Sequence, residues 1–147
     1  MARAAFMLQG VSGTIEFSQV SPSQPVKVCV DLSGLGGNAG GFHVHQLPVP
    51  QRIDSEDNPC LRTGGHFNPF NIDASLSPVA GEGSYEEYEV GDLSGKYGSL
   101  AGQEERSDCY MDTNLNLFGD YSIVNRSVVI HKNPGGNRWV CADIELA

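Results

Sequence analysis

Histidine is the residue type whose placement in this chain most clearly indicates chemistry. The sequence has only four: His43, His45, His66 and His131. His43 and His45 are two residues apart in an alternating segment, so a strand would place both imidazoles on one face, roughly 6–7 Å apart. A lone histidine is more often structural, but this pair with two further imidazoles is typical of a metal site. Imidazoles without thiolates or a carboxylate cluster suit copper, zinc, iron or nickel, so residue chemistry alone leaves the metal open.

The four cysteines, Cys29, Cys60, Cys109 and Cys141, are widely spaced and form no C-x-x-C motif. This spacing argues against a thiolate zinc site and against a thioredoxin-type redox pair. An even number of scattered cysteines favours two disulfide bonds and an oxidising compartment. The alternative is four buried free thiols in a cytosolic protein.

We expect β-strands to position the histidines and cysteines, because apolar and polar residues alternate along much of the sequence. Apolar and polar residues alternate in Val26–Ser33, with Cys29 on the outward face. His43 and His45 likewise face away from their apolar neighbours. Eight short segments are predicted as strands: Arg3–Leu8, Thr14–Val20, Val26–Ser33, Gly41–Gln46, Asp92–Tyr97, Arg106–Asp112, Ser127–His131 and Arg138–Leu146. Strands of this number and length predict an antiparallel sandwich or barrel.

The segment Leu47–Gly91 interrupts this pattern. It contains five prolines, several glycines and little alternation. A loop of this length is usually functional. Neither an internal repeat nor a linker is visible, so we expect residues 1–147 to form a single domain.

Composition and charge exclude several classes of protein. The 18 glycines and 8 prolines divide the chain into pieces too short for a helix bundle. Nine basic residues against 18 acidic ones give a net charge of −9, which repels nucleic acid and anionic lipid. No apolar run approaches the roughly 18 residues of a membrane span, so we expect no membrane insertion. The apolar stretch Ala4–Leu8 is too short for a signal peptide.

Five motifs occur in the order found in copper/zinc superoxide dismutases, and together they contain all four histidines. They are Gly41-Phe-His-Val-His45, Gly65-His-Phe-Asn-Pro69, Val90-Gly-Asp-Leu93, Gly119-Asp120 and Val128-Val-Ile-His131. The flanking Pro25-Val-Lys-Val28 and Arg138-x-x-Cys141 fit the same pattern. From about Ala4 to Leu146 the chain therefore resembles this family.

The resemblance implies a fold and a set of roles. The fold is all-β: an eight-stranded antiparallel Greek-key β-barrel, flattened like an immunoglobulin sandwich, with one long disulfide-tethered loop. The implied substrate is superoxide and the implied cofactor is copper, with four histidine ligands: His43, His45, His66 and His131. Arg138 matches the arginine that guides superoxide to copper, and Cys60 and Cys141 match the family disulfide. Cys109 aligns with a strand beside Cys29, so we expect these two cysteines to pair as well.

Two departures from the family pattern remove its zinc site and its charged loop. No histidine lies between His66 and His131. Glu89 stands where the last zinc histidine would be, three residues before the retained Asp92. Residues 132–137 form a short segment in place of the family's long charged loop. Loss of both features resembles the copper-only branch, which comprises extracellular fungal enzymes and tandem-repeat animal proteins.

We therefore expect a copper-only superoxide dismutase that contains no zinc. In this interpretation copper oxidises one superoxide to O2 and reduces a second to hydrogen peroxide. Arg138 attracts the anion and His66 takes up a proton. Glu89, with Asp92 nearby, is expected to hold the second nitrogen of His66 in place of zinc. The alternative is a non-catalytic extracellular copper-binding or structural domain, although Arg138 would serve no purpose in storage.

The same resemblance gives expectations for the whole protein. It implies a secreted or cell-surface domain whose signal peptide is missing from this sequence. Relatives without zinc are often monomers, so we expect a monomeric domain. The start at a strand suits one excised repeat of a longer chain.

Overall fold

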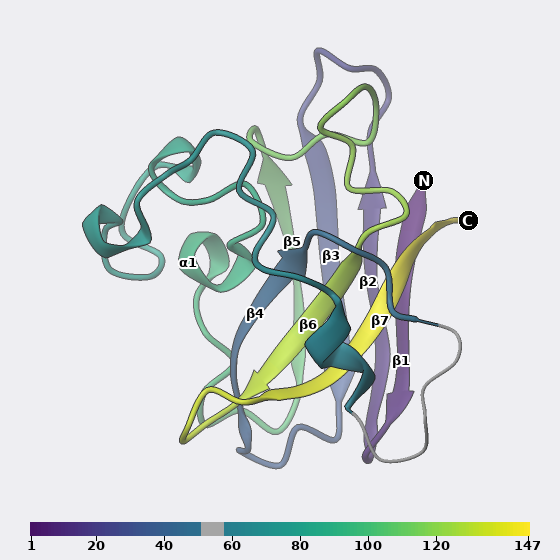
Figure 1. Ribbon diagram of the computed structural model, residues 1–147, viewed down its shortest axis with the longest axis vertical. Coiled ribbons are helices and arrows are strands. Elements are labelled where there is room, and N and C mark those ends of the chain that lie inside the picture. The colour runs from purple at the N-terminus through teal and green to yellow at the C-terminus, as the bar shows by residue number, and fades with distance from the viewer. Residues whose placement is uncertain (51–57) are drawn as a thin grey trace.

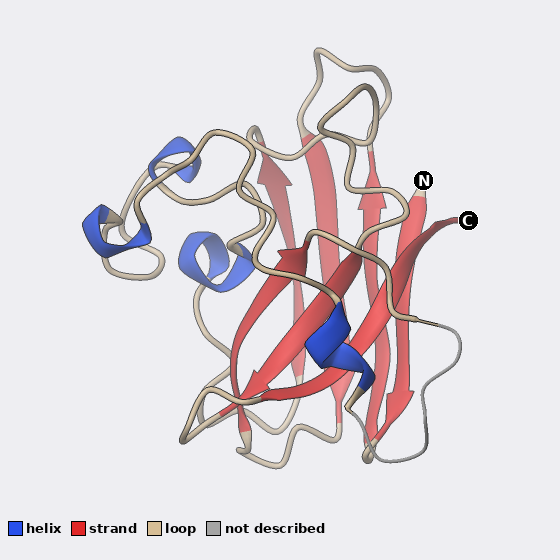
Figure 2. Cartoon of the chain, viewed as in Figure 1, coloured by secondary structure: helices blue, strands red, loops and turns tan. Residues whose placement is uncertain are grey.

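Antiparallel β-strands form most of the regular secondary structure of the computed structural model, which describes residues 1–50 and 58–147 (Figure 1). The strands are β1 (Ala2–Leu8), β2 (Val11–Ser18), β3 (Val26–Ser33), β4 (Ala39–His45), β5 (Arg106–Asp112), β6 (Ser127–Lys132) and β7 (Arg138–Leu146). The helical elements are short: η1 (Pro59–Arg62), η2 (Ala74–Leu76), η3 (Tyr85–Glu87) and α1 (Leu93–Tyr97). Figure 2 shows η2, η3 and α1 at the left of the view, beside the sheet, whereas η1 lies in front of it. The described residues include no helix long and apolar enough to span a membrane.

The strands follow the order β4-β6-β7-β1-β2-β3-β5. Because β4 and β5 are the two edges, the sheet is a half-open barrel rather than a closed one. The connection from β3 to β4 crosses from the strand beside one edge to the opposite edge, and the connection from β4 to β5 joins the two edges, which is Greek-key connectivity. β4, β6 and β7 cross over the remaining strands, as Figure 1 shows.

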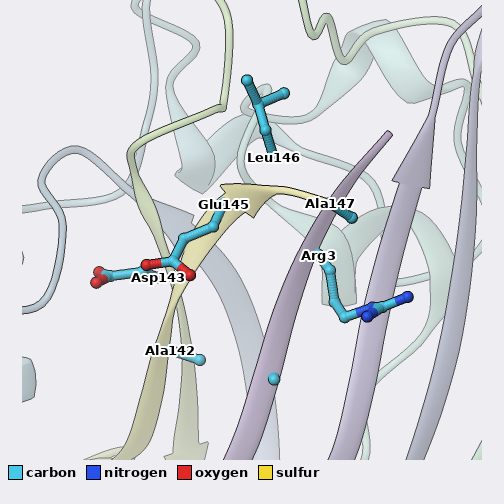
Figure 3. A pocket seen from close by; sticks show the side chains of 7 residues that line it. Arg3, Ala142, Asp143, Glu145, Leu146 and Ala147 are labelled. Atoms are coloured by element: carbon cyan, nitrogen blue, oxygen red, sulfur yellow. The ribbon is translucent and has the colours of Figure 1, made fainter.

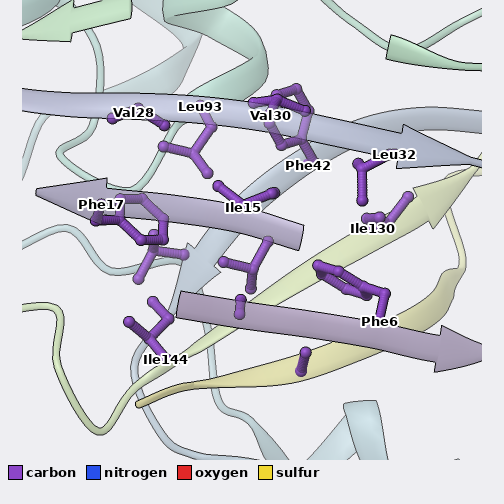
Figure 4. Packing of buried hydrophobic residues seen from close by; sticks show 14 of the residues in the cluster. Phe6, Ile15, Phe17, Val28, Val30, Leu32, Phe42, Leu93, Ile130 and Ile144 are labelled. Atoms are coloured by element: carbon purple, nitrogen blue, oxygen red, sulfur yellow. The ribbon is translucent and has the colours of Figure 1, made fainter. Parts of the chain in front are cut away.

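Alternation along the strands builds the core between these two parts of the sheet. In β3, Val26, Val28, Val30 and Leu32 are buried, whereas Lys27 and Asp31 are exposed. Figure 4 shows Val28, Val30 and Leu32 packed with Phe42 of β4 and Ile130 of β6. The apolar face of each strand is therefore committed to the core, and the opposite face of β4 and β6 is left for the histidines.

One predicted strand is wrong. The predicted strand Asp92–Tyr97 is instead the cap residue Asp92 followed by α1 (Leu93–Tyr97), so the described part of the chain has seven strands instead of eight. Asp92 caps this helix by accepting the Gly95 N–H at 2.9 Å, and Gly98, with φ of +95°, ends it. Leu93 and Tyr97 are then one turn apart on the same buried face.

Two disulfide bonds, Cys29–Cys109 and Cys60–Cys141, join distant parts of the chain. Both pairings are those expected from the sequence. Cys29 and Cys109 lie directly opposite each other on β3 and β5. Cys60, in η1, ties the long loop to β7. Part of that predicted loop, residues 51–57, lies outside the described residues.

Candidate metal centre

The four histidines converge at one place on the outer face of β4 and β6. One nitrogen of each ring lies within 4.8 Å of a nitrogen of every other: His43, His45, His66 and His131. Two rings come from β4, one from the long loop and one from the end of β6. The structure thus brings together the whole set that the sequence indicates, although the chain separates its first and last members by 88 residues.

A triangle of backbone hydrogen bonds assembles these segments. The Val44 N–H donates to Gly91 O at 2.8 Å, the Gly91 N–H to Phe67 O at 2.9 Å, and the Phe67 N–H to Val44 O at 2.8 Å. Gly91 has to be a glycine, because a Cβ atom there would lie 2.4 Å from Val44 O. Each corner of the triangle is next to a candidate site residue or one residue removed from it. The triangle therefore fixes the two loop segments against β4.

Three of the rings present the same nitrogen to the centre. Oxygen acceptors lie against the Nδ1 atoms of His45, His66 and His131: Gly64 O at 3.0 Å, Glu89 Oε1 at 2.8 Å and Gly136 O at 2.9 Å. A neutral imidazole that donates its Nδ1–H keeps its lone pair on Nε2. The Nε2 atoms of His45 and His131 are 3.4 Å apart. Each of these rings is thus oriented to offer Nε2 as a ligand.

His43 has the opposite orientation. Its Nδ1 is buried and has no hydrogen-bond partner in the structure. Its Nε2 lies 3.3 Å from Ser94 Oγ and 3.5 Å from Asp92 Oδ1. An unpaired buried nitrogen is costly unless a ligand satisfies it. This nitrogen, together with the three Nε2 atoms, fits an imidazole-bound metal such as copper.

Three of the histidines, His43, His45 and His131, stay neutral at physiological pH. Burial lowers the pKa of His43 well below 6.5 and that of His45 from 6.5 to about 4. Burial also lowers the pKa of His131, and the neighbouring charges of His66 and Arg138 add to this effect. Neutral rings keep the lone pairs that a metal requires.

Arg138 lies beside the cluster, opposite His131 in the β6–β7 register. Its Nη1 donates to Cys60 O at 2.8 Å and to Thr63 Oγ1 at 3.2 Å. The carbonyl acceptor belongs to the cysteine that is bonded to β7, so the disulfide and the arginine fix the same turn. No hydrogen bond to Nε or Nη2 is seen within the described residues, which leaves these donors available to an anion.

Glu89 and Asp92 contact different histidines. Glu89 is buried and contacts His66, as the sequence predicts. The Asp92 carboxylate instead caps α1 and faces His43. Its link to Glu89 is a backbone one, from the Asp92 N–H to Glu89 O.

Several residues that support the site were not predicted from the sequence. Gly64 and Gly136 act through their carbonyl groups, which no side-chain pattern reveals. Gly41 carries a readable signal, because it lies two residues before His43. A Cβ at this position would lie 2.9 Å from Cε1 of His43, so only glycine leaves room for the ring.

A separate polar groove runs between β1 and β7 and is lined in part by Arg3, Asp143 and Glu145 (Figure 3). None of its lining residues belongs to the histidine cluster. This groove therefore takes no part in the histidine cluster.

Comparisons with known proteins agree with this geometry. The family model described as copper/zinc superoxide dismutase matches residues 11–141. Superoxide dismutase [Cu-Zn] 4 of Dictyostelium discoideum is 36% identical over 144 residues, covering 93% of this chain and 87% of the relative. The cell surface Cu-only superoxide dismutase 5 of Candida albicans is 38% identical, and 92% of this chain spans 55% of that relative.

Solved structures give the same result. The Cu(II) form of Candida albicans superoxide dismutase 5 superposes with a TM-score of 0.78 at 33% identity, covering 99% of this chain and 91% of the other. The fold is thus shared over almost the whole chain. The chain belongs to the copper/zinc superoxide dismutase family.

Proposed function

We propose that this protein disproportionates superoxide at a single copper ion and contains no zinc. The observation that carries the proposal is the set of four imidazoles, each oriented by its partners to offer one free nitrogen to a common centre. Copper held by these rings supplies one-electron chemistry, so that two superoxide ions and two protons become O2 and hydrogen peroxide. The family membership supports this activity.

His66 and Glu89 are suited to handle one of the protons. About a third of the His66 side chain is exposed, whereas the Glu89 side chain is 11% exposed. Glu89 accepts the Nδ1–H of His66, so a second proton at Nε2 would form an imidazolium next to a carboxylate. The carboxylate stabilises that charge, and the exposed ring can exchange the proton with solvent.

Arg138 provides positive charge in a chain whose net charge is −9. Its guanidinium is anchored through Nη1, and its other donors have no hydrogen-bond partner among residues 1–50 and 58–147. A small anion approaching the histidines therefore meets a local field opposite in sign to that of the whole protein. We assign Arg138 the role of attracting and orienting superoxide.

The partner of His66 Nδ1 supports a centre without zinc. A bridging histidine would need this nitrogen for a second metal, and Glu89 occupies it at 2.8 Å. Within residues 1–50 and 58–147, the four histidines are the one group of side chains gathered closely enough to bind a metal. The Cu-only relative of Candida albicans is consistent with this proposal.

The activity is tested by measuring superoxide decay with copper-loaded protein. We expect catalytic decay that exceeds the rate given by the same amount of free copper in the presence of a chelator. The His43→Gln variant removes one candidate ligand and should lose copper binding and activity together. Stoichiometric copper binding without catalysis would favour the alternative of a copper-binding domain.

The two disulfides and the cell-surface Candida relatives also support an extracellular location. A peptide map under non-reducing conditions, made on protein from its native source, tests this assignment. We expect both cystines to be present. Free thiols at all four cysteines would contradict an oxidising compartment.

A further inference from the structure

A fully buried ion pair lies beside the metal centre. Lys96 of α1 and Asp112 at the end of β5 have side chains that are 0% exposed, and Lys96 Nζ lies 3.0 Å from Asp112 Oδ2. Asp112 also accepts the Asn114 and Leu115 N–H groups through Oδ1 and the Tyr97 hydroxyl through Oδ2. Nothing in the proposed chemistry uses these charges. A buried pair adds little net stability compared with apolar residues, so its position calls for another explanation.

Lys96 connects β5 to the segment that contacts the histidines. Besides binding Asp112, its Nζ donates to Val90 O at 2.7 Å. Val90 directly follows Glu89, whose carboxylate holds His66. The same short segment includes Asp92, which faces His43.

Further contacts hold α1 on β5. The rings of Tyr97 and Tyr110 stack with centroids 4.3 Å apart. Arg106 Nη2 donates to Tyr97 O at 2.7 Å. These contacts hold the C-terminal end of α1. The Lys96 ammonium instead contacts Val90, the residue next to Glu89.

The geometry points to Lys96 as a positioning residue for the copper site, with Asp112 as its anchor. The inference rests on the proposed function, in which no second metal ion fixes residues 89–92. The Gly91 triangle fixes this segment against β4, and Lys96 adds a tie to β5 by joining Val90 O to the Asp112 carboxylate. Glu89 and Asp92 are thereby held where they orient His66 and His43. The rings of His45 and His131, which are held by backbone carbonyls, do not depend on Lys96.

The test is a comparison of Lys96→Met with Lys27→Met, the same substitution at an exposed lysine of β3. The histidine ring resonances of metal-free protein are recorded by NMR, and copper affinity is measured separately. In Lys96→Met we expect the His66 and His43 rings to shift while those of His45 and His131 keep their positions. Copper affinity should fall about tenfold, the lower end of the range for losing a ligand's outer partner. Lys27→Met should change neither quantity.

A double variant separates positioning from stability. Lys96→Met leaves Asp112 without its cation, so part of any effect could come from a weakened fold. Lys96→Met with Asp112→Asn removes that buried charge but still lacks the donor to Val90 O. We expect its unfolding midpoint to recover toward that of the parent while the His66 and His43 shifts persist. Ring positions that return with stability, or four rings that shift together, would overturn the inference.

The metal-free readout keeps this inference distinct from the proposed function. Suppose that the protein has no dismutase activity but that Lys96→Met shifts only the His66 and His43 rings. This result would support the positioning role of Lys96 and contradict the proposed function. If the protein is active and Lys96→Met changes neither the ring resonances nor the copper affinity, only the positioning role of Lys96 is contradicted.

Discussion

At the residue scale, side-chain identity indicated the candidate ligands but not their orientation. The sequence indicates His43, His45, His66 and His131 because two of them share a strand face and all four lie in family motifs. Which nitrogen each ring offers depends on carbonyl groups of Gly64 and Gly136 and on the Ser94 hydroxyl. Backbone carbonyls are present in every residue, so no sequence pattern marks these two. Glu89 could be predicted because it stands at a position where the family pattern has a metal ligand.

The Glu89 carboxylate gives the sharpest prediction at this scale. Glu89→Ala removes the acceptor for His66 Nδ1–H, and we expect copper affinity to fall roughly 10- to 100-fold. Glu89→Gln keeps an acceptor oxygen but not the negative charge, so copper binding should persist. Its activity should fall increasingly from pH 6 to 9, because the protonated His66 ring has lost its counter-charge. Copper titration and superoxide decay across this range measure both effects.

The control is Glu82→Ala, which removes an exposed acid from the same loop. It should match the parent protein in both assays. If the two Glu89 variants also match the parent from pH 6 to 9, the carboxylate has no part in the site.

At the scale of elements, the strands were predictable and one helix was not. Period-two alternation places β3 correctly because one face of the strand is buried and the other is solvated. Residues 92–97 also alternate, but Leu93 and Tyr97 satisfy helical spacing equally well. The N-cap at Asp92 and the C-terminal glycine Gly98 favour the helical conformation of α1. The apolar pattern alone was therefore ambiguous, and local capping resolved it.

The short β6–β7 connection leads to a prediction for Arg138. Residues 133–137 are all exposed, and a connection this short does not cover the histidines. Steering of superoxide should then depend largely on Arg138, so Arg138→Ala should lower activity about tenfold at low salt. The difference should shrink at 1 M salt, where the Debye length is about 3 Å. Rates at both ionic strengths, at equal copper content, measure this effect.

Lys132→Ala is the matched control, because it removes an exposed positive charge at the end of β6. It should have a smaller effect than Arg138→Ala. Equal activity of Arg138→Ala and the parent at low ionic strength would remove Arg138 from the mechanism.

At the scale of the whole molecule, the sequence predicted an antiparallel barrel, but not which edges remain open. Closure depends on whether residues 92–97 pair as a strand, and their helical conformation leaves β4 and β5 as edges. The convergence of the four histidines likewise depends on contacts between segments that are far apart in the chain. It requires the β4–β6 pairing and the backbone triangle around Gly91 at the same time.

Burial of the histidines predicts how the stability of the metal-free protein depends on pH. The pKa of His45 is lowered from 6.5 to about 4, so between these values the unfolded chain binds more protons than the folded one. Unfolding free energy should therefore be highest above pH 6.5 and fall as the pH drops toward 4, by at most about 3 kcal/mol from this residue. His43 and His131 act in the same direction. Urea unfolding at pH 7.5, 6, 5 and 4.5 measures the slope.

His45→Gln serves as the comparison, because it removes the histidine whose pKa is lowered to about 4. Its stability should depend less steeply on pH over the same range. A slope equal to that of the parent would show that His45 is not held neutral by burial.

The single-copper centre is tested most directly by the metal content of the protein after exposure to both metals. Metal-free protein is incubated with equal, excess copper and zinc, treated with a mild chelator, and analysed for both elements per chain. Because four imidazoles converge on one centre and Glu89 occupies Nδ1 of His66, we predict one copper and no retained zinc. About one zinc per chain that resists the chelator, alongside the copper, would contradict a single-copper centre without zinc.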